Sequence, residues 1–281
     1  MIKGVKMDSH LLKVFVAVAK KGNISQAAIE LDCAQSNVTS RIKQLEKNLD
    51  IKLFNRVSKG VKLTYEGEKL YPDAVEIIHK LEEAEAKIKN LNKQEILKVS
   101  STQVNAPIRL VPFISKLKKD FPEKKIELYT NTSLLVIDSI LNYDVDIGFI
   151  CGKTEHKDIK ILKEFEEELY IVEALNDNIQ NCVFTYIDSC IYYIYLASLL
   201  RNEGNNDFET VTIENYETIL ACVELGMGRA ILPINLIKKY GYENKLKLKK
   251  VDDSNTNFST CLICRKDNEP NEINYFKNIE L

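Results

Sequence analysis

The architecture is decided by residues 25–63, which read SQAAIELDCAQSNVTSRIKQLEKNLDIKLFNRVSKGVKL. Ser25 belongs to the residue types that cap helix N-termini, so it predicts a short helix that continues to Leu31. A turn over residues 32–34 leads into a longer helix, whose apolar positions recur at helical spacing: Val38, Ile42, Leu45 and Leu49. Two helices joined by so short a connection are typical of a helix-turn-helix.

The segments on either side complete this domain. An earlier helix, which stops at Gly22, is predicted by four apolar residues at helical spacing, Leu11, Val14, Phe15 and Val18. After the motif, residues 51–54 and 60–63 are expected to pair as two short strands. We therefore expect residues 1–65 to form an all-α winged helix-turn-helix domain, with the strand pair as its wing.

The composition is that of an ordinary folded protein. The chain has 281 residues, of which 45% are hydrophobic and 28% charged, and this length allows two or three compact units. No stretch approaches the roughly 18 consecutive apolar residues of a membrane span, and residues 1–10 lack the features of a secretory signal. We expect a cytoplasmic protein without a membrane partner.

Charge is distributed unevenly along the chain. Residues 1–65 carry ten lysines and two arginines against five acidic residues, a net charge of +7. Because the whole chain has a net charge of −2, the remaining residues carry −9. A basic head on an acidic body indicates that the head alone meets a polyanion.

A heptad pattern follows the wing. Apolar residues alternate in steps of four and three at Leu70, Ala74, Ile77, Leu81, Ala84, Ile88 and Leu91. So narrow a stripe on a lone helix is marginal in water, so we expect residues 66–93 to form a linker helix that pairs with a second copy. The alternative is that the stripe lies on the protein's own core. Pro72 is expected to kink or restart this helix.

Residues 94–281 alternate between strand-like and helix-like segments, which favours an α/β fold with largely parallel sheets. Two such series, one beginning near Leu97 and the other near Leu169, indicate paired subdomains with a cleft between them. In open α/β sheets, ligands bind beyond the C-terminal ends of strands and near helix N-termini. This rule places a ligand after the strands predicted at 97–102 and 125–130, and after a strand of the second series that ends near Tyr186.

The ordered motifs resemble the LysR-type transcriptional regulators. They are Ser25–Ala28, residues 35–46, residues 53–56, residues 63–67 and the late segment LGMGRAILP at residues 225–233. The resemblance implies a mixed fold, in which a winged helix-turn-helix and a linker helix precede a periplasmic-binding-protein-like effector domain of two α/β subdomains. It also implies double-stranded DNA as a partner, assembly into dimers or tetramers, and control by a small-molecule effector.

Candidate DNA contacts lie on the outward face of the third helix and on the wing. Gln and Asn can pair with adenine edges, Ser and Thr with bases or phosphates, and basic residues with the DNA backbone. The candidates are Ser25, Gln35, Ser36, Asn37, Thr39, Ser40, Lys43, Arg56 and Lys59. Family members often have Ser-Gln-Pro-x-Leu-Ser-Arg where this chain has residues 34–40 (AQSNVTS), so their base preference does not transfer; Gln35 and Thr39 are the safest carry-overs.

Candidate effector contacts follow from the strand-end rule. They are Ser101, Thr102, Gln103, Asn131, Thr132, Ser189 and Cys190. Hydroxyls and helix-end amides suit a small organic anion, although the same residue types are ordinary helix caps.

No catalytic constellation, metal site or cofactor motif is predicted. The three histidines are far apart in sequence, and the Cys261–Cys264 pair lies in a run typical of a buried strand, which would point the two thiols to opposite faces. Cys182 and Cys190 have no basic residue adjacent that would lower a thiol pKa, so thiol sensing is not favoured. Two alternatives to an effector-controlled regulator stay open: an architectural DNA binder, and a small-molecule binding protein without transcriptional control.

Overall fold

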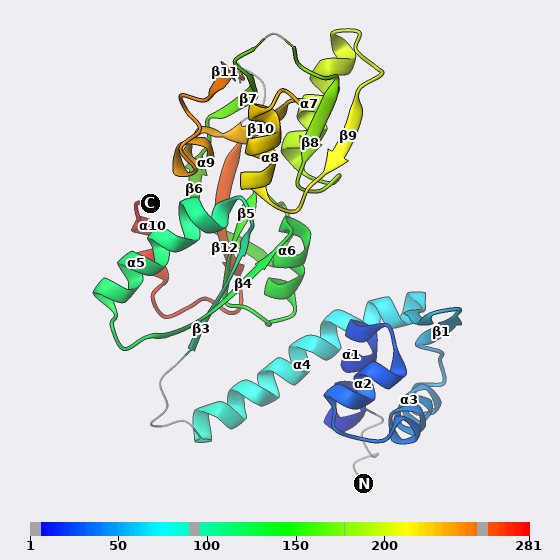
Figure 1. Cartoon of the computed structure of the whole chain (residues 1–281). Coiled ribbons are helices and arrows are strands. Elements are labelled where there is room, and N and C mark those ends of the chain that lie inside the picture. Colours follow the sequence, from blue (N-terminus) through cyan, green and yellow to red (C-terminus); the bar gives the residue numbers. More distant parts are fainter. Residues whose placement is uncertain (1–6, 90–95, 177, 252–257) are drawn as a thin grey trace. The chain divides into compact units, whose positions relative to one another are not determined.

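A computed structural model describes residues 7–89, 96–176, 178–251 and 258–281 (Figure 1). The chain divides into two compact units, residues 1–93 and residues 94–281. They are called the N-terminal unit and the C-terminal unit below.

Three helices form the body of the N-terminal unit: α1 (Ser9–Lys21), α2 (Ile24–Glu30) and α3 (Gln35–Leu49). Asp8 caps α1 by accepting the Leu11 N–H at 2.9 Å. The cap of α2 is Asn23, whose Oδ1 accepts the N–H groups of Ser25 and Gln26. The prediction of Ser25 as this cap was wrong. Asn23, two residues earlier, has an extended backbone, and its side chain accepts the free N–H groups at the start of the helix.

The wing is the antiparallel pair β1 (Phe54–Val57) and β2 (Gly60–Leu63). The first strand was predicted three residues too early, at 51–54. The Leu53 carbonyl still accepts the Thr64 N–H at 2.9 Å, but the Leu53 N–H donates to Glu46 instead of to a partner strand, so the regular strand begins at Phe54. Gly60 has φ of +139°, and a Cβ there would lie 2.2 Å from the Gly22 carbonyl oxygen, so the wing needs glycine where it meets the end of α1.

Helix α4 (Tyr65–Lys89) is continuous through Pro72, so the helix does not restart there. Proline removes one helical hydrogen bond, while the neighbouring residues pack on the core of the N-terminal unit. Ala74 is fully buried there, and Leu70, Tyr71 and Ile78 pack against the same cluster. The side chain of Ile88 and all of Leu91 lie outside the described residues.

The first subdomain of the C-terminal unit is built on a five-stranded sheet with the order β4-β3-β5-β12-β6. Its strands are β3 (Ile96–Thr102), β4 (Lys125–Asn131), β5 (Ile147–Cys151), β6 (Ile159–Glu166) and β12 (Ser259–Arg265). Its helical elements are the π-helical turn η1 (Ala106–Leu110), α5 (Val111–Asp120), α6 (Ser133–Leu141) and α10 (Ile273–Asn278).

The second subdomain holds a three-stranded sheet, β10-β7-β11, and a parallel pair, β8-β9. Its strands are β7 (Leu169–Ala174), β8 (Cys182–Thr185), β9 (Glu209–Thr212), β10 (Ala230–Pro233) and β11 (Leu246–Lys250). Its helices are α7 (Ile191–Asn202), α8 (Tyr216–Glu224) and α9 (Ile234–Lys239). The chain passes between the subdomains twice, from β6 to β7 and back from β11 to β12.

The sheets are mixed rather than largely parallel, which corrects the prediction. Among the strand pairs of the described residues, β3 with β4, β3 with β5, and β8 with β9 are parallel, and the other pairs are antiparallel. Strand β12 returns from the second subdomain and lies antiparallel between β5 and β6. Such a return cannot be read from local alternation. The two thiols of β12 do face opposite ways, as predicted: Cys261 packs with Val136 and Ile140, whereas Cys264 packs with Phe113 and Phe149.

Candidate functional site

Helix α3 presents a polar face at the surface and buries its apolar face. Val38 and Leu45 have no exposed surface. Five of the predicted outward side chains line one shallow hollow on the helix: Gln35, Ser36, Thr39, Ser40 and Lys43. Asn37 is also exposed but does not line this hollow. We call these five residues the reading face.

The other predicted contacts of this unit are also at the surface. Ser25 is exposed in the first turn of α2, Arg56 is exposed on β1, and Lys59 is exposed in the turn between β1 and β2. Within the reading face, the Thr39 hydroxyl donates to the Gln35 carbonyl at 3.0 Å. The Thr39 oxygen therefore remains available mainly as an acceptor.

Glu46 fixes the wing to α3, a role that the sequence analysis missed. Its Oε1 accepts the Leu53 N–H at 2.9 Å, and its Oε2 accepts from the Lys52 ammonium at 2.9 Å. Burial by itself would raise the pKa of Glu46, but the hydrogen bonds from Lys52, Leu53 and Phe54 outweigh it and lower the pKa overall. The signal was an acidic residue four positions after Ile42, on the apolar face of the helix.

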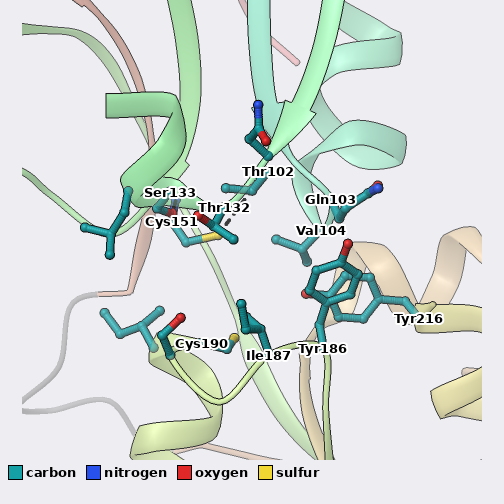
Figure 2. Close-up of a pocket in the computed structure, with 14 residues that line it drawn as sticks. Thr102, Gln103, Val104, Thr132, Ser133, Cys151, Tyr186, Ile187, Cys190 and Tyr216 are labelled. Carbon is teal, nitrogen blue, oxygen red and sulfur yellow. Dashed lines mark hydrogen bonds between the residues drawn. The ribbon is translucent and has the colours of Figure 1, made fainter. Parts of the chain in front are cut away.

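The C-terminal unit contains a cavity of about 260 Å³ between its two subdomains (Figure 2). The first subdomain supplies the ends of β3, β4 and β5 and the start of α6. The second supplies the segment from Tyr186 to Ile191 and the first residue of α8, Tyr216. The lining residues are Thr102, Gln103, Val104, Asn131, Thr132, Ser133, Leu134, Cys151, Tyr186, Ile187, Ser189, Cys190, Ile191 and Tyr216.

The structure brings six of the seven predicted effector residues to this cavity: Thr102, Gln103, Asn131, Thr132, Ser189 and Cys190. Ser101 does not line it. Its side chain has no exposed surface, and its hydroxyl donates to the Thr102 carbonyl at 3.0 Å. Alternation along β3 turns Ser101 away from the cavity that Thr102 reaches.

The strand-end rule did not select the apolar lining residues. Val104, Leu134, Ile187 and Ile191 lie within two residues of predicted positions, but apolar side chains were not considered as ligand contacts. Tyr216 could have been found from Asn215, whose Oδ1 accepts the Thr218 N–H and caps α8 directly before it. Cys151 stands at the end of β5, where the same rule applies.

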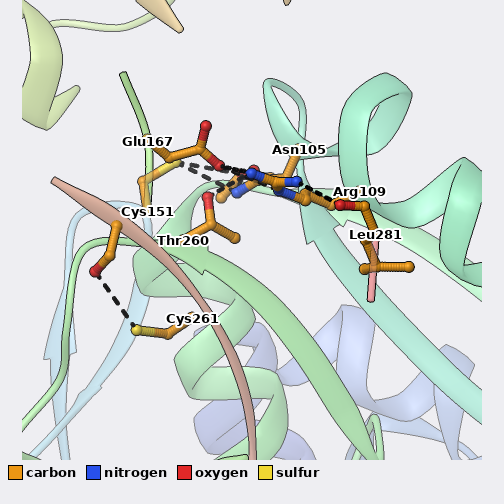
Figure 3. A network of polar contacts seen from close by, with 9 residues as sticks. Asn105, Arg109, Cys151, Glu167, Thr260, Cys261 and Leu281 are labelled. Carbon is orange, nitrogen blue, oxygen red and sulfur yellow. Dashed lines mark hydrogen bonds and ion pairs between the residues drawn. The ribbon is translucent and has the colours of Figure 1, made fainter. Parts of the chain in front are cut away.

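A buried hydrogen-bond network supports the floor of the cavity (Figure 3). Asn105 Nδ2 donates to Thr102 Oγ1 at 2.8 Å and to Cys151 Sγ at 3.5 Å, and Asn105 Oδ1 accepts from Thr260 Oγ1 at 2.8 Å. Thr260 belongs to β12, which begins just after the second passage between the subdomains. The network therefore links the lining of the cavity to the interior of the sheet.

A buried ion pair lies at the first passage between the subdomains. The Arg109 guanidinium contacts Glu167 Oε1 through Nη2 at 2.8 Å and Nε at 3.2 Å, and its Nη1 donates to the Leu281 carbonyl (Figure 3). Glu167 stands between β6 and β7, and both side chains are more than nine-tenths buried. The pair ties η1 to the segment between β6 and β7. Removing one partner would leave the other charge buried and uncompensated.

The lining of the cavity is uncharged at neutral pH. Burial raises the pKa of the Cys151 thiol to about 11 and raises the pKa of Cys190. Burial also raises the pKa of Cys182, which confirms the expectation that neither Cys182 nor Cys190 has a lowered thiol pKa. The pKa of Tyr216 lies well above its ordinary value for the same reason. The cavity thus offers hydrogen bonds and apolar surface without a formal charge.

Across residues 7–89, 96–176, 178–251 and 258–281, no three His, Cys, Asp or Glu side chains gather as metal ligands would. In the same ranges, no helix combines the length and apolarity that crossing a membrane requires.

Two family models match the chain. Residues 9–68 match the model for the bacterial regulatory helix-turn-helix protein of the lysR family, and residues 92–276 match the LysR substrate binding domain. Among similar proteins, the HTH-type transcriptional regulator GltR of Bacillus subtilis is 31% identical, over 93% of this chain and 91% of its own length. The uncharacterized HTH-type transcriptional regulator YusT of the same organism is also 31% identical, over 93% of this chain and 90% of its own.

Solved structures of full length share the fold. A full-length OxyR variant from Pseudomonas aeruginosa has a TM-score of 0.68 at 18% identity, covering 97% of this chain and 94% of that one. CbnR in complex with its target DNA has a TM-score of 0.57 at 19% identity, covering 96% of this chain and 97% of that one. The chain therefore belongs to the LysR family and is a DNA-binding transcriptional regulator with an effector-binding domain.

Proposed function

We propose that the reading face of α3 enters the major groove and that the wing contacts the DNA backbone or minor groove. The observation that carries this proposal is a surface hollow formed by five polar side chains of α3, away from its buried apolar face. An α-helix fits the major groove, where each base pair presents a distinct pattern of donors and acceptors. The solved complex of the similar regulator CbnR with its target DNA supports this role.

The residues of the N-terminal unit divide between two tasks. Gln35 can form a bidentate pair with adenine, and the Thr39 oxygen can accept from a base amino group. Lys43, Arg56 and Lys59 are exposed cations that suit phosphate contacts. Ser25, Ser36, Asn37 and Ser40 are exposed hydrogen-bonding residues that can position the helix on the backbone.

We propose that residues 66–93 pair two copies of the chain. Ile77 and Leu81 are 42% and 41% exposed although both are large and apolar, whereas Ala74 of the same stripe is buried in the chain's own core. Two exposed apolar residues one turn apart on a long helix suit knobs-into-holes packing with a second helix. The resulting dimer would present two reading faces to paired half-sites.

We propose that residues 94–281 bind the effector in the cavity between the subdomains. Because both subdomains line this cavity, a ligand there would favour one relative orientation of the two over others. That change would reach the DNA contacts through the rest of the assembly. The role is regulatory rather than catalytic, and a protein that binds bacterial DNA acts in the cytoplasm.

Substitutions that separate base contacts from phosphate contacts test the proposal. With a fragment of the upstream DNA, Gln35→Ala should cost about 1–3 kcal/mol and relax the sequence preference. Lys43→Ala should weaken binding to specific and random DNA alike. It should also reduce the slope of log affinity against log salt concentration by about one, the contribution of one phosphate contact. The control is Lys119→Ala, an exposed lysine of α5 in the other unit. If all three variants bind DNA with the same affinity, sequence preference and salt dependence, the assignment of α3 as the helix that contacts DNA is contradicted.

A further inference from the structure

Two cysteines line the cavity, one from each subdomain (Figure 2). Cys151 ends β5 in the first subdomain, and Cys190 directly precedes α7 in the second. Figure 2 shows both side chains at the cavity, on the two walls that these subdomains form. The other cysteines of the chain, all within the described residues, do not line it. The fold therefore places two thiols from distant segments at one enclosed space.

Both sulfur atoms are held in place by hydrogen bonds. Cys151 Sγ lies 3.5 Å from Thr102 Oγ1 and accepts from Asn105 Nδ2 at 3.5 Å. Asn105 is itself almost fully buried. Cys190 Sγ accepts from two backbone N–H groups in the first turn of α7, which partly oppose the rise in its pKa that burial causes. A ligand for these two sulfurs thus meets a site that is already ordered.

The two sulfurs are thiols rather than thiolates at neutral pH. Burial raises the pKa of Cys151 to about 11, the neighbouring Cys190 contributes to that rise, and burial also raises the pKa of Cys190. Oxidants react with the thiolate, so this pair is poorly suited to redox sensing. A soft metal cation is different, because it displaces the proton as it binds the sulfur.

The surroundings restrict the kind of cation. Among the described residues, no third His, Cys, Asp or Glu side chain joins this pair as a metal ligand would. Structural zinc sites are almost always tetrahedral, so zinc would lack most of its ligands here. Thiolates select soft cations. Two thiolates and a divalent cation form a neutral complex, which suits a cavity whose lining carries no charged side chain.

We propose that Cys151 and Cys190 form a dithiol site for a soft divalent cation that takes two ligands, with Hg²⁺ as the probe. Each sulfur exchanges its proton for one metal–sulfur bond, so two protons are released and no electron is transferred. Because the sulfurs belong to different subdomains, the bound ion bridges them. The binding site stands apart from the proposed function; its effect on DNA binding rests on that function.

Equilibrium dialysis of the full chain against Hg²⁺ in about 0.1 mM glutathione tests the site. A single thiol loses the ion to glutathione, whereas two ordered thiols retain it because the second bond forms within the protein at a high effective concentration. Wild type should retain about one ion per chain, and Cys151→Ser and Cys190→Ser should each bind it about ten-fold or more weakly. The proposal is overturned if wild type loses the ion, if either variant retains it equally, or if Zn²⁺ is retained as tightly.

The matched control is Cys222→Ser, which replaces a half-buried cysteine of α8 outside the cavity and should leave retention unchanged. Serine is an ordinary helix cap, so Cys190→Ser should keep the start of α7. Cys151→Ala is a second variant for the other sulfur, and melting temperatures without metal show which variants fold. Sedimentation should give the same mass with and without Hg²⁺; an increase would mean that the ion bridges two copies, which overturns the proposal.

The outcome is separable from that of the proposed function. A chain that binds its upstream DNA specifically but loses Hg²⁺ to glutathione contradicts this site alone. A chain that retains Hg²⁺ as described, but whose affinity for that DNA is the same with and without the ion, leaves the site standing and contradicts the control of DNA binding through the cavity.

Discussion

The reading face and the cavity are assembled in different ways. The reading face comes from residues 35–43 of one helix, whereas the cavity is assembled from five separate segments between Thr102 and Tyr216. In the first case, helical periodicity alone determines which side chains point outward. In the second, strand pairing and chain crossovers bring the side chains together. A site on one helix can therefore be derived from local pattern, while a site between subdomains depends on tertiary structure.

The largest expected effect concerns the linker helix, where local pattern predicts a contact with another copy. Replacing both Ile77 and Leu81 with Lys should convert dimers into monomers, because two charges would be buried at the pairing helix. Sedimentation velocity measures the change, and binding to upstream DNA should weaken strongly. If the double variant remains dimeric, the pairing role of this stripe is wrong. Glu76→Lys, at an exposed position of the same helix outside the stripe, is the control.

The separation into two units is tested by core substitutions. Phe149→Ala should destabilise the C-terminal unit by about 3–5 kcal/mol, because this ring is fully buried and packs against the Phe113 ring, with the two ring centroids 5.5 Å apart. Leu45→Ala, also fully buried, should destabilise the N-terminal unit by about 2–5 kcal/mol. Denaturation followed by limited proteolysis should assign each loss to its own unit. Equal loss in both units from either variant would show that they unfold as one.

A smaller effect is expected where α3 meets the wing. Glu46→Ala removes the acceptor of the buried Leu53 N–H, so the N-terminal unit should lose about 1–3 kcal/mol. Affinity for DNA should fall as the wing loses its anchor. Gln44→Ala, at an exposed position of the same helix, should leave stability nearly unchanged. If chemical denaturation gives the same midpoint for both variants, Glu46 does not anchor the wing to α3.

The smallest effect is a dependence on pH. Because the pKa of Glu46 is lowered in the folded protein from 4.5, its stabilising contribution is present above pH 4.5 and is lost as pH falls through the lowered value. Glu46→Gln cannot titrate, so the difference in unfolding free energy between wild type and variant should be largest above about pH 5 and should shrink on acidification. A difference that stays constant from neutral to acidic pH would show that ionisation of Glu46 does not contribute.

Much of the fold follows from the sequence because it depends on local pattern. Helices α2 and α3 and strand β7 begin within two residues of their predicted starts, and α1 ends directly before Gly22, where its end was predicted. The errors occur where a distant group competes. Asn23 takes the cap assigned to Ser25, and Glu46 holds Leu53 out of the wing ladder. The antiparallel place of β12 depends on a crossover that no local alternation encodes.

The same distinction applies to the site. Polar residues after β3 and β4 were selected because strand ends and helix starts coincide there. The stacking of Tyr186 on Tyr216 joins segments 30 residues apart in the chain, so no local pattern predicts this pair. Ser101 was included because sequence position alone does not tell which of two adjacent residues at a strand end faces the cavity. The structure places Thr102 there, and alternation along β3 turns Ser101 away.

The most direct test of the division between reading face and cavity is a titration of the full chain against fragments of its own upstream DNA. Anisotropy would be measured over a range of salt concentrations with random DNA as competitor. A regulator of this kind should bind one fragment with an affinity that falls steeply with salt and at least about a thousand-fold more tightly than random DNA. Binding that is absent, or equal for every sequence, would contradict sequence-specific regulation by this protein.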